Sequence, residues 1–351
     1  MPIRGIFPAI FILLPMAAQL RADPPAAEFK NGHWVAVAPP APPPPTTDPQ
    51  LDHMQQLLDN GDAAAALNVG IYWVKSHSNK APLRDRCLYL IAQAKFKAPS
   101  GFPNEANRIS AYYYLDELMD EYPESKLFYP ALELQYKIAD DYLNGYKDRF
   151  LGFPVVSEYD RAEEMLYRIQ QRSPGSPLAE KALLRTCDYY YSTAEFELAH
   201  DAYGFYIKNY PRSPMLPQVK LRQAFSSLAQ FHGVRFDPTC LIDGRAELSD
   251  IIAAYPEMAR QQNLKALIAR IDTALARKLL VTGDYYRRTR ALIGAVYTYR
   301  YLIQTYPDSD DAATARKTLE SMPKAVLAEP PPRSNAQFQL PAGPPAPGKG
   351  N

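Results

Sequence analysis

Residues 180–212 read EKALLRTCDYYYSTAEFELAHDAYGFYIKNYPR. Counting back from Pro211, the spacing puts a large, a small and an aromatic residue on one face of a first helix, and one small and two aromatic residues on one face of a second. These residues are Leu183, Cys187 and Tyr190, then Ala199, Tyr203 and Tyr206. Small residues let two antiparallel helices approach closely, aromatic rings fill the space between them, and Pro211 ends the second helix. The stretch therefore predicts a helical hairpin.

The closing turn of this hairpin recurs along the chain. Its prolines stand at positions 123, 174, 211, 256 and 307, so the spacings are 51, 37, 45 and 51 residues. Without insertions the unit approaches the roughly 34 residues of the tetratricopeptide repeat (TPR). We predict an all-α TPR solenoid of six helix pairs and a capping helix over residues 312–322, with disordered proline-rich ends. The residues expected to hold the two clearest hairpins together are Tyr190, Ala199, Tyr203 and Pro211, and Tyr286, Ala295, Tyr299 and Pro307.

Three insertions are expected between paired helices, over residues 99–103, 146–156 and 233–243.

The distribution of proline marks the ends of the solenoid. Of the 34 prolines, 12 lie in residues 1–50 and 8 in residues 323–351, whereas all 25 tyrosines lie between Tyr72 and Tyr306. Aromatic residues build a core, and proline-rich segments without them form extended spacers. We expect a linker over residues 23–49, the solenoid over residues 50–322 and a tail over residues 323–351.

Residues 1–22 have the pattern of a secretory signal peptide. Arg4 precedes an apolar run over residues 6–16, and small residues follow at Ala17, Ala18 and Ala22. The run is shorter than the roughly 20 residues of a membrane-spanning helix, although an uncleaved anchor is the alternative. Cleavage after Ala18 and cleavage after Ala22 both stay open. We expect a periplasmic protein without a lipid-attachment cysteine, because the first cysteine is Cys87.

The sequence carries no motif of a catalytic, metal or cofactor site. Its three cysteines and five histidines are scattered, and it has no GxGxxG, GxxxxGK[ST] or GxSxG sequence. Acidic pairs such as Asp116-Glu117 are more typical of solvated helix faces than of acid and base catalysis. A net charge of +1 gives no electrostatic footprint for nucleic acid. We predict a protein that is not an enzyme, needs no cofactor or metal, and binds proteins or peptides.

Stacked helix pairs form a concave groove that holds an extended peptide or a partner helix. The groove candidates are tyrosines that the repeat pattern does not need: Tyr112, Tyr113, Tyr189 and Tyr191. Charge is divided, because residues 105–145 carry 9 acidic and 3 basic side chains and residues 259–322 carry 11 basic and 6 acidic ones. Arg287, Arg288 and Arg290 form the densest basic cluster and suit carboxylates of another protein. A solvated helix face with pairs inside the chain is the alternative.

The closing turns also carry a family resemblance. Tyr122-Pro-Glu-Ser125, Tyr210-Pro-Arg-Ser213 and Tyr306-Pro-Asp-Ser309, with the last repeats over residues 274–313, resemble the TPR proteins similar to BamD, the outer-membrane lipoprotein of the β-barrel assembly machinery. The resemblance covers most of residues 50–322. It implies a periplasmic scaffold at the outer membrane whose N-terminal repeats receive unfolded outer-membrane proteins and whose C-terminal repeats dock on the barrel-forming partner. Peripheral membrane association would then run through partners, and Arg287, Arg288 and Arg290 would belong to the docking surface.

Two departures from that family leave other functions open. The lipid-attachment cysteine is missing, and the chain has insertions and a sixth helix pair. One alternative is a periplasmic TPR adaptor that coordinates cell-wall or envelope-constriction machinery. Another is an accessory domain of a hydrolase or transferase, in which the acidic segment binds a polysaccharide.

Overall fold

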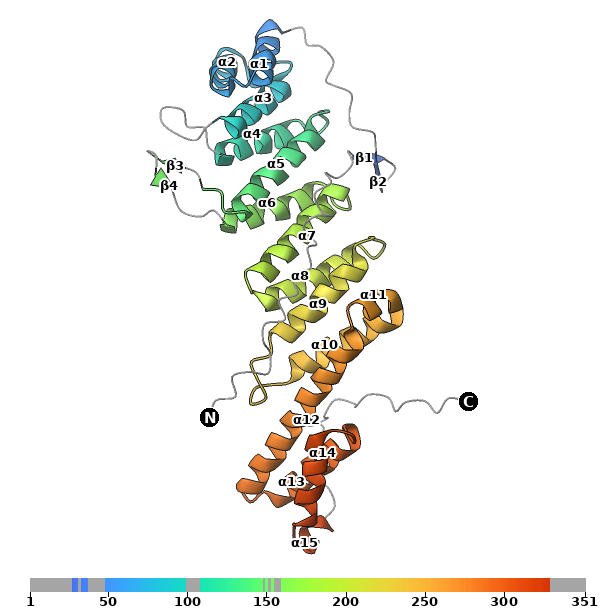
Figure 1. Ribbon diagram of the computed structural model, residues 1–351. Helices are drawn as coiled ribbons and strands as arrows, with labels where there is room; N and C mark the ends of the chain where they lie inside the picture. The colour runs from blue at the N-terminus through green and yellow to red at the C-terminus, as the bar shows by residue number, and fades with distance from the viewer. Residues whose placement is uncertain are drawn as a thin grey trace. The chain divides into compact units, whose positions relative to one another are not determined.

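The computed structural model describes residues 27–30, 33–36, 48–98, 108–147, 149–150, 153–154 and 159–328. The expected signal peptide and most of the expected tail lie outside these residues. The chain divides into two compact units, Met1–Thr186 and Cys187–Asn351. Helices dominate both units, which confirms the prediction of an all-α TPR-type solenoid (Figure 1).

Unit 1 contains three consecutive helix pairs and two short antiparallel hairpins (Figure 1). The pairs are α1 (Pro49–Asp59) with α2 (Ala63–Ser76), α3 (Arg84–Lys97) with α4 (Arg108–Glu121), and α5 (Phe128–Leu143) with α6 (Tyr159–Arg172). The hairpins are β1 (Ala27–Lys30) with β2 (His33–Ala36), and β3 (Arg149–Phe150) with β4 (Phe153–Pro154). The first hairpin lies in the expected linker and the second in the expected insertion, so neither segment is wholly without regular structure.

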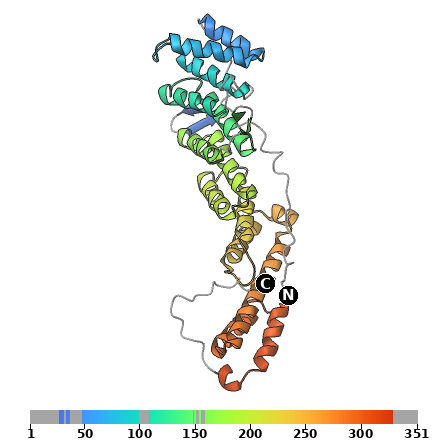
Figure 2. The same ribbon diagram turned by 90° about the vertical axis from the view of Figure 1, so that its left-hand side faces the viewer.

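Unit 2 begins within α7 (Pro177–Ser192) and continues the series of pairs. The remaining helices are α8 (Phe196–Asn209), α9 (Leu216–Ala229), α10 (Thr239–Ala254), α11 (Pro256–Gln261), α12 (Leu264–Arg288), α13 (Leu292–Thr305), α14 (Asp310–Glu320) and α15 (Lys324–Leu327). The long helix α12 runs beside α13 (Figure 2), and α14 packs on both. The insertion expected over residues 233–243 is shorter than predicted, because α10 begins at Thr239. The first residues of the tail expected from residue 323 form the short helix α15.

The closing turns owe their shape to serine. In the last turn the backbone N–H of Ser309 donates to the carbonyl of Tyr306 at 3.2 Å, and the Ser309 hydroxyl accepts from the N–H of Ala312 at 3.1 Å. Ser309 is thus the N-cap of α14, where a side-chain oxygen satisfies an otherwise unpaired helix N–H. Ser176 does the same for α7, with its hydroxyl accepting from Ala179 at 3.0 Å. At these two turns a proline ends one helix and the serine two residues later caps the next, whereas after Ser125 and Ser213 the next helix begins three residues further on, at Phe128 and Leu216.

The turns inside the pairs use a residue with positive φ. These residues are Gly61 (φ 83°), Gly145 (90°), Ala194 (63°) and Arg290 (63°). In every case the next N–H donates at 2.9 Å to the carbonyl five residues earlier, which is the Schellman geometry of a helix C-terminus. Two of the four positions lack glycine, so composition alone does not mark them.

Aromatic and small side chains fill the pairs. Ala199, Tyr203, Ala295 and Tyr299 are fully buried, as are Trp73 in α2 and Tyr142 in α5. Tyr190 and Tyr286, expected in the core, are only half-buried. Each of these two tyrosines supplies the carbonyl of a Schellman bond, so each stands at the end of its helix, where the neighbouring helix covers the side chain incompletely.

Candidate protein-binding surfaces

The basic cluster lies at the turn between α12 and α13. Arg287 and Arg288 close α12, and Arg290 follows in the positive-φ position. All three side chains are exposed. Arg287 contacts Asp284 at 3.5 Å, whereas within the described part of the chain Arg288 and Arg290 form no ion pair. Arg287 therefore has an ion-pair partner in its own helix, whereas Arg288 and Arg290 lie at the turn without one among the described residues.

Arg287 belongs to a network that recurs in unit 2. The hydroxyl of the buried Tyr299 donates to Asp284 at 2.7 Å, and burial, with the bond to Asp284, raises the pKa of Tyr299 to about 12. In the α7–α8 hairpin, two hairpins earlier, the Tyr203 hydroxyl donates to Asp188 at 2.8 Å, with the same separation of 15 residues. Asp284 thus joins α12 to α13 and also contacts Arg287. The Arg287 side chain therefore has a partner within the chain, although it is exposed to solvent.

Apolar side chains accompany the arginines. Tyr285 on α12 is 55% exposed, and Ile293 and Tyr297, four residues apart on α13, are each 41% exposed. Large exposed apolar side chains next to cations are typical of protein-binding surfaces. We call Tyr285, Arg288, Arg290, Ile293 and Tyr297 the C-terminal patch. Its apolar members were not among the residues predicted from the sequence, although Ile293 and Tyr297 have the i, i+4 spacing of one helix face.

The candidate tyrosines of α4 have different environments. Tyr113 is 57% exposed, but Tyr112 is only 5% exposed and belongs to the core of unit 1. Burial raises the pKa of Tyr112 well above its usual range. Tyr112 was a wrong choice for a partner-contacting residue, because α4 buries a second face that also contains Met119.

The candidate tyrosines of α7 are half-buried. The ring of Tyr191 meets that of Phe196 edge to face at 5.7 Å, and the Arg222 guanidinium lies 5.8 Å from its centroid. The ring centroids of Tyr189 and Tyr190 lie 6.1 Å apart. Both rings therefore have contacts inside unit 2, and only part of each remains open to a ligand.

The acidic segment is largely paired within unit 1. Asp116 contacts Arg172 at 2.8 Å and Arg168 at 3.1 Å, so α4 and α6 are tied together. Further pairs join Glu117 to Arg84, Asp140 to Arg185 and Asp141 to Arg108. The charge imbalance of residues 105–145 is thus compensated mainly by Arg84, Arg168, Arg172 and Arg185, which lie outside that segment, and this leaves it less free charge for an external ligand.

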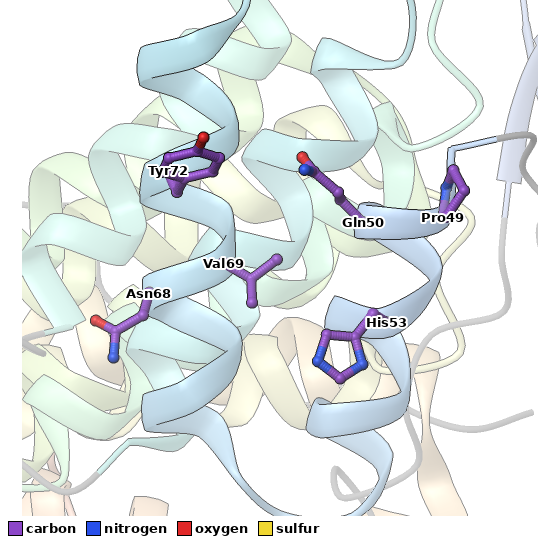
Figure 3. Close-up of a pocket in the computed structure, with 6 residues that line it drawn as sticks. All are labelled: Pro49, Gln50, His53, Asn68, Val69 and Tyr72. Atoms are coloured by element: carbon purple, nitrogen blue, oxygen red, sulfur yellow. The ribbon is translucent and has the colours of Figure 1, made fainter.

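Two hollows occur in unit 1. The first, of about 170 Å³, lies between the first helices of two successive pairs and is lined by Tyr89, Gln93, Phe96, Lys97, Pro130, Glu133, Leu134 and Lys137. The second, of about 540 Å³, lies between α1 and α2 and is lined by Pro49, Gln50, His53, Asn68, Val69 and Tyr72 (Figure 3). Neither hollow could be predicted from the sequence, because each depends on how two helices pack.

The structure also bears on membrane and metal binding. No helix in the described ranges has both the length and the apolar character that crossing a membrane requires. In the same ranges no group of three or more His, Cys, Asp or Glu side chains is arranged to hold a metal ion. The buried thiols of Cys87 and Cys187 are free, and burial raises the pKa of Cys87 to about 12, so it stays a protonated thiol near neutral pH.

The sequence profile of the YfiO family, described as outer membrane lipoprotein, matches residues 156–332, which is half of the chain. The chain belongs to this BamD-like family. No curated protein matches the chain significantly. Membership of the YfiO family places the protein at the outer membrane. The matched range contains the helices α6 to α15 and, with them, the whole C-terminal patch.

Proposed function

We propose that the protein is a periplasmic TPR scaffold of outer-membrane protein assembly, which binds unfolded barrel segments and a membrane partner. The YfiO-family match over residues 156–332 is the observation that carries this proposal. The helical-hairpin fold supports it, because such folds present extended binding surfaces without chemistry of their own.

The C-terminal patch is the proposed docking surface for the membrane partner. Arg288 and Arg290 offer planar guanidinium groups for bidentate bonds to carboxylates. Tyr285, Ile293 and Tyr297 supply apolar contact area beside them. Aromatic residues and arginine dominate the energetics of protein interfaces. The partner we expect is therefore a folded domain with carboxylates around an apolar face.

The hollow between α3 and α5 is the proposed site for unfolded segments. Tyr89 and Phe96 give it an apolar floor, and Lys97, Glu133 and Lys137 give it charges of both signs. Barrel strands alternate apolar and polar side chains. An extended segment of that kind would place apolar residues on the floor and polar ones against the charged rim.

Photocrosslinking in cells tests the docking proposal. A photoreactive residue replaces Arg288, and the matched control replaces Arg212, an exposed arginine of the α8–α9 turn. We expect adducts with a component of the barrel assembly machinery from position 288 and few from position 212. Adducts only with cell-wall or septal proteins would support the envelope adaptor and overturn the proposal.

A second crosslink tests the receiving site. The photoreactive residue replaces Lys97, and the control replaces Lys208, which is exposed on α8. With a urea-denatured outer-membrane barrel protein diluted into the reaction, we expect adducts from position 97 and none above background from position 208. Equal yields from both positions would show unspecific contact and remove the hollow from the proposal.

A further inference from the structure

The α1–α2 hollow lies on the first helix pair of the solenoid. Helix α3 packs against both α1 and α2. Among the described helices none precedes α1. Terminal repeats of solenoids need a cap, because each repeat otherwise leaves an interface face in water. The C-terminal repeat has such a cap in α14, and the N-terminal one has an open hollow.

The chemistry of the hollow restricts its occupant. Tyr72, Val69 and Pro49 present apolar surface, and Tyr72 is 64% exposed (Figure 3). None of the six lining residues carries a carboxylate, an ammonium or a guanidinium group. Gln50 and Asn68 add side-chain amides, which no other described residue engages. The hollow therefore suits an uncharged apolar segment that offers hydrogen-bond acceptors.

The sequence directly before α1 contains a segment of that kind. Residues 37–47 read VAPPAPPPPTT and contain no charged residue. They lead directly to Asp48, whose carboxylate accepts from the Trp73 indole N–H at 2.7 Å and from the Gln50 N–H at 2.9 Å. These bonds fix the point where the segment enters α1, and the next residue, Pro49, already lines the hollow.

We propose that the proline-rich run, residues 39–45, docks in the α1–α2 hollow and caps the first repeat. Prolines have no N–H and favour the polyproline II helix, whose carbonyls accept hydrogen bonds and whose rings pack on aromatic side chains. Gln50 and Asn68 supply the donors, and Tyr72 supplies the ring. A short connection gives the run an effective concentration in the mM range, so a weak contact suffices. The other proline-rich segment carries Arg333 and Lys349, which this hollow does not match.

Hydrogen exchange of the full chain tests whether the run caps α1 and α2. In one variant, serine replaces the prolines of residues 39–45. The control variant carries serine at positions 330–332. Tyr72→Ala, alone and combined with the first variant, removes the ring with little effect on folding because Tyr72 is exposed. We expect amide exchange of α1 and α2 to quicken several-fold in the first variant and in Tyr72→Ala, with no further increase in the double variant. Unchanged exchange in the first variant, or additive effects in the double variant, would overturn the proposal.

A photoreactive residue at position 72 identifies the occupant directly. We expect an adduct within one chain that maps to residues 37–47 and whose yield is independent of protein concentration. An adduct with residues 329–351, a concentration-dependent adduct between two copies, or an adduct only with another protein would each contradict the proposal.

Discussion

At the scale of single residues, Arg290 shows how one position serves two demands. Its charge belongs to the basic cluster, but its φ of 63° is a left-handed conformation that costs most side chains energy. Gly61 and Gly145 hold the same position in earlier turns, and Ala194 holds it in the α7–α8 turn. An arginine there is compatible with folding only because the Schellman bonds fix the turn.

Arg290→Gly should stabilise the protein by about 0.5–1 kcal/mol. Glycine avoids the roughly 1–2 kcal/mol cost of a left-handed residue and gives back part of it, about 0.4–1 kcal/mol, as entropy of the unfolded chain. Urea unfolding followed by circular dichroism measures the difference. Arg288→Gly is the control, because Arg288 is helical and should lose about 1 kcal/mol. A loss of stability in Arg290→Gly would contradict the role assigned to the turn. If Arg290 also contacts the membrane partner, Arg290→Gly should lower the yield of partner adducts from a photoreactive residue at position 288, although it makes the fold more stable.

His200 is a second residue whose environment makes a measurable prediction. Its Nε2 lies 2.8 Å from Glu247, which also accepts from the Ser227 hydroxyl at 2.9 Å, and its Nδ1 lies 3.5 Å from Asp201. The hydrogen bond to Glu247 raises the pKa of His200 above its ordinary value. A raised pKa means that the folded protein binds the proton more tightly than the unfolded chain does.

The stabilising effect of His200 should therefore be complete below about pH 6.5, the unfolded pKa, and should fade as the pH rises through the higher folded pKa. The measurement compares the free energy of unfolding of the wild type and His200→Gln from pH 5.5 to 8.5. Glutamine keeps a hydrogen-bond donor but cannot take up the proton. A difference that grows toward high pH would contradict the assignment.

At the scale of elements, some neighbouring helices approach each other closely at a glycine. A Cβ on Gly283 of α12 would lie 2.5 Å from the ring of Tyr299 on α13, and one on Gly70 of α2 would lie 2.6 Å from Ile91 on α3. By contrast, a Cβ on Gly294 would meet Tyr286 at 3.5 Å, an ordinary contact. The glycines that matter are therefore those that face a buried side chain of the next helix.

Gly283→Ala should destabilise the protein by about 1–2 kcal/mol, because overpacking against the buried Tyr299 outweighs the gain in helix propensity. Gly294→Ala is the matched control in the adjacent helix and should be neutral or stabilising by up to about 1 kcal/mol. Thermal and urea unfolding measure both. Equal effects of the two substitutions would show that α12 and α13 do not approach each other as closely as described.

Ion pairs join the first helix of one pair to the first helix of the next pair. Asp52 of α1 meets Arg86 of α3 at 3.1 Å, and Asp188 of α7 meets Arg222 of α9 at 2.5 Å, in both cases 34 residues apart. The separation of one repeat length means that the solenoid period also spaces these charges. Such partly exposed pairs contribute specificity of stacking more than net stability.

At the scale of the whole molecule, the fold is a series of local cores. Each described hydrophobic cluster belongs mainly to one or two helix pairs, and Trp73 anchors the first with 1% exposure and its ring stacked on His77 at 4.2 Å. In repeat proteins each unit contacts only its neighbours, so a defect lowers stability locally. The two compact units are therefore expected to respond separately to substitutions in their cores.

Trp73→Phe should lose about 2–3 kcal/mol of local stability, since it removes the bond to the ionised Asp48 along with indole packing. Hydrogen exchange should quicken in α1, α2 and α3 and stay unchanged in α12 and α13. Tyr72→Phe, on the exposed neighbour, should change neither region. Quicker exchange in α12 and α13 would show that the molecule unfolds as one cooperative unit.

The helix pairs and their closing turns could be predicted from the sequence because their causes are local. A proline that ends a helix, a serine that caps the next and small residues at helical spacing act over four to ten residues. The insertion before α10 was predicted too long, since its expected bounds included Leu241, which is buried and continues the helical spacing of Leu248 and Ile251. The α11 and α15 helices were missed because both are too short to show a period.

The hairpin repeat and the family resemblance follow from local sequence, the latter through the Tyr-Pro-x-Ser turns. Which candidate residues are available to a partner depends on how the helices pack. Tyr112 and Tyr113 are neighbours of equal chemistry, yet one is core and the other exposed, because a solenoid helix buries a second face against the following repeat. The hollow between α1 and α2 likewise depends on tertiary structure, because side chains of both helices line it. The apolar spacing along one helix predicts which face packs on the other helix of its pair. Surfaces formed by several helices depend on the distances between those helices, which are set by packing.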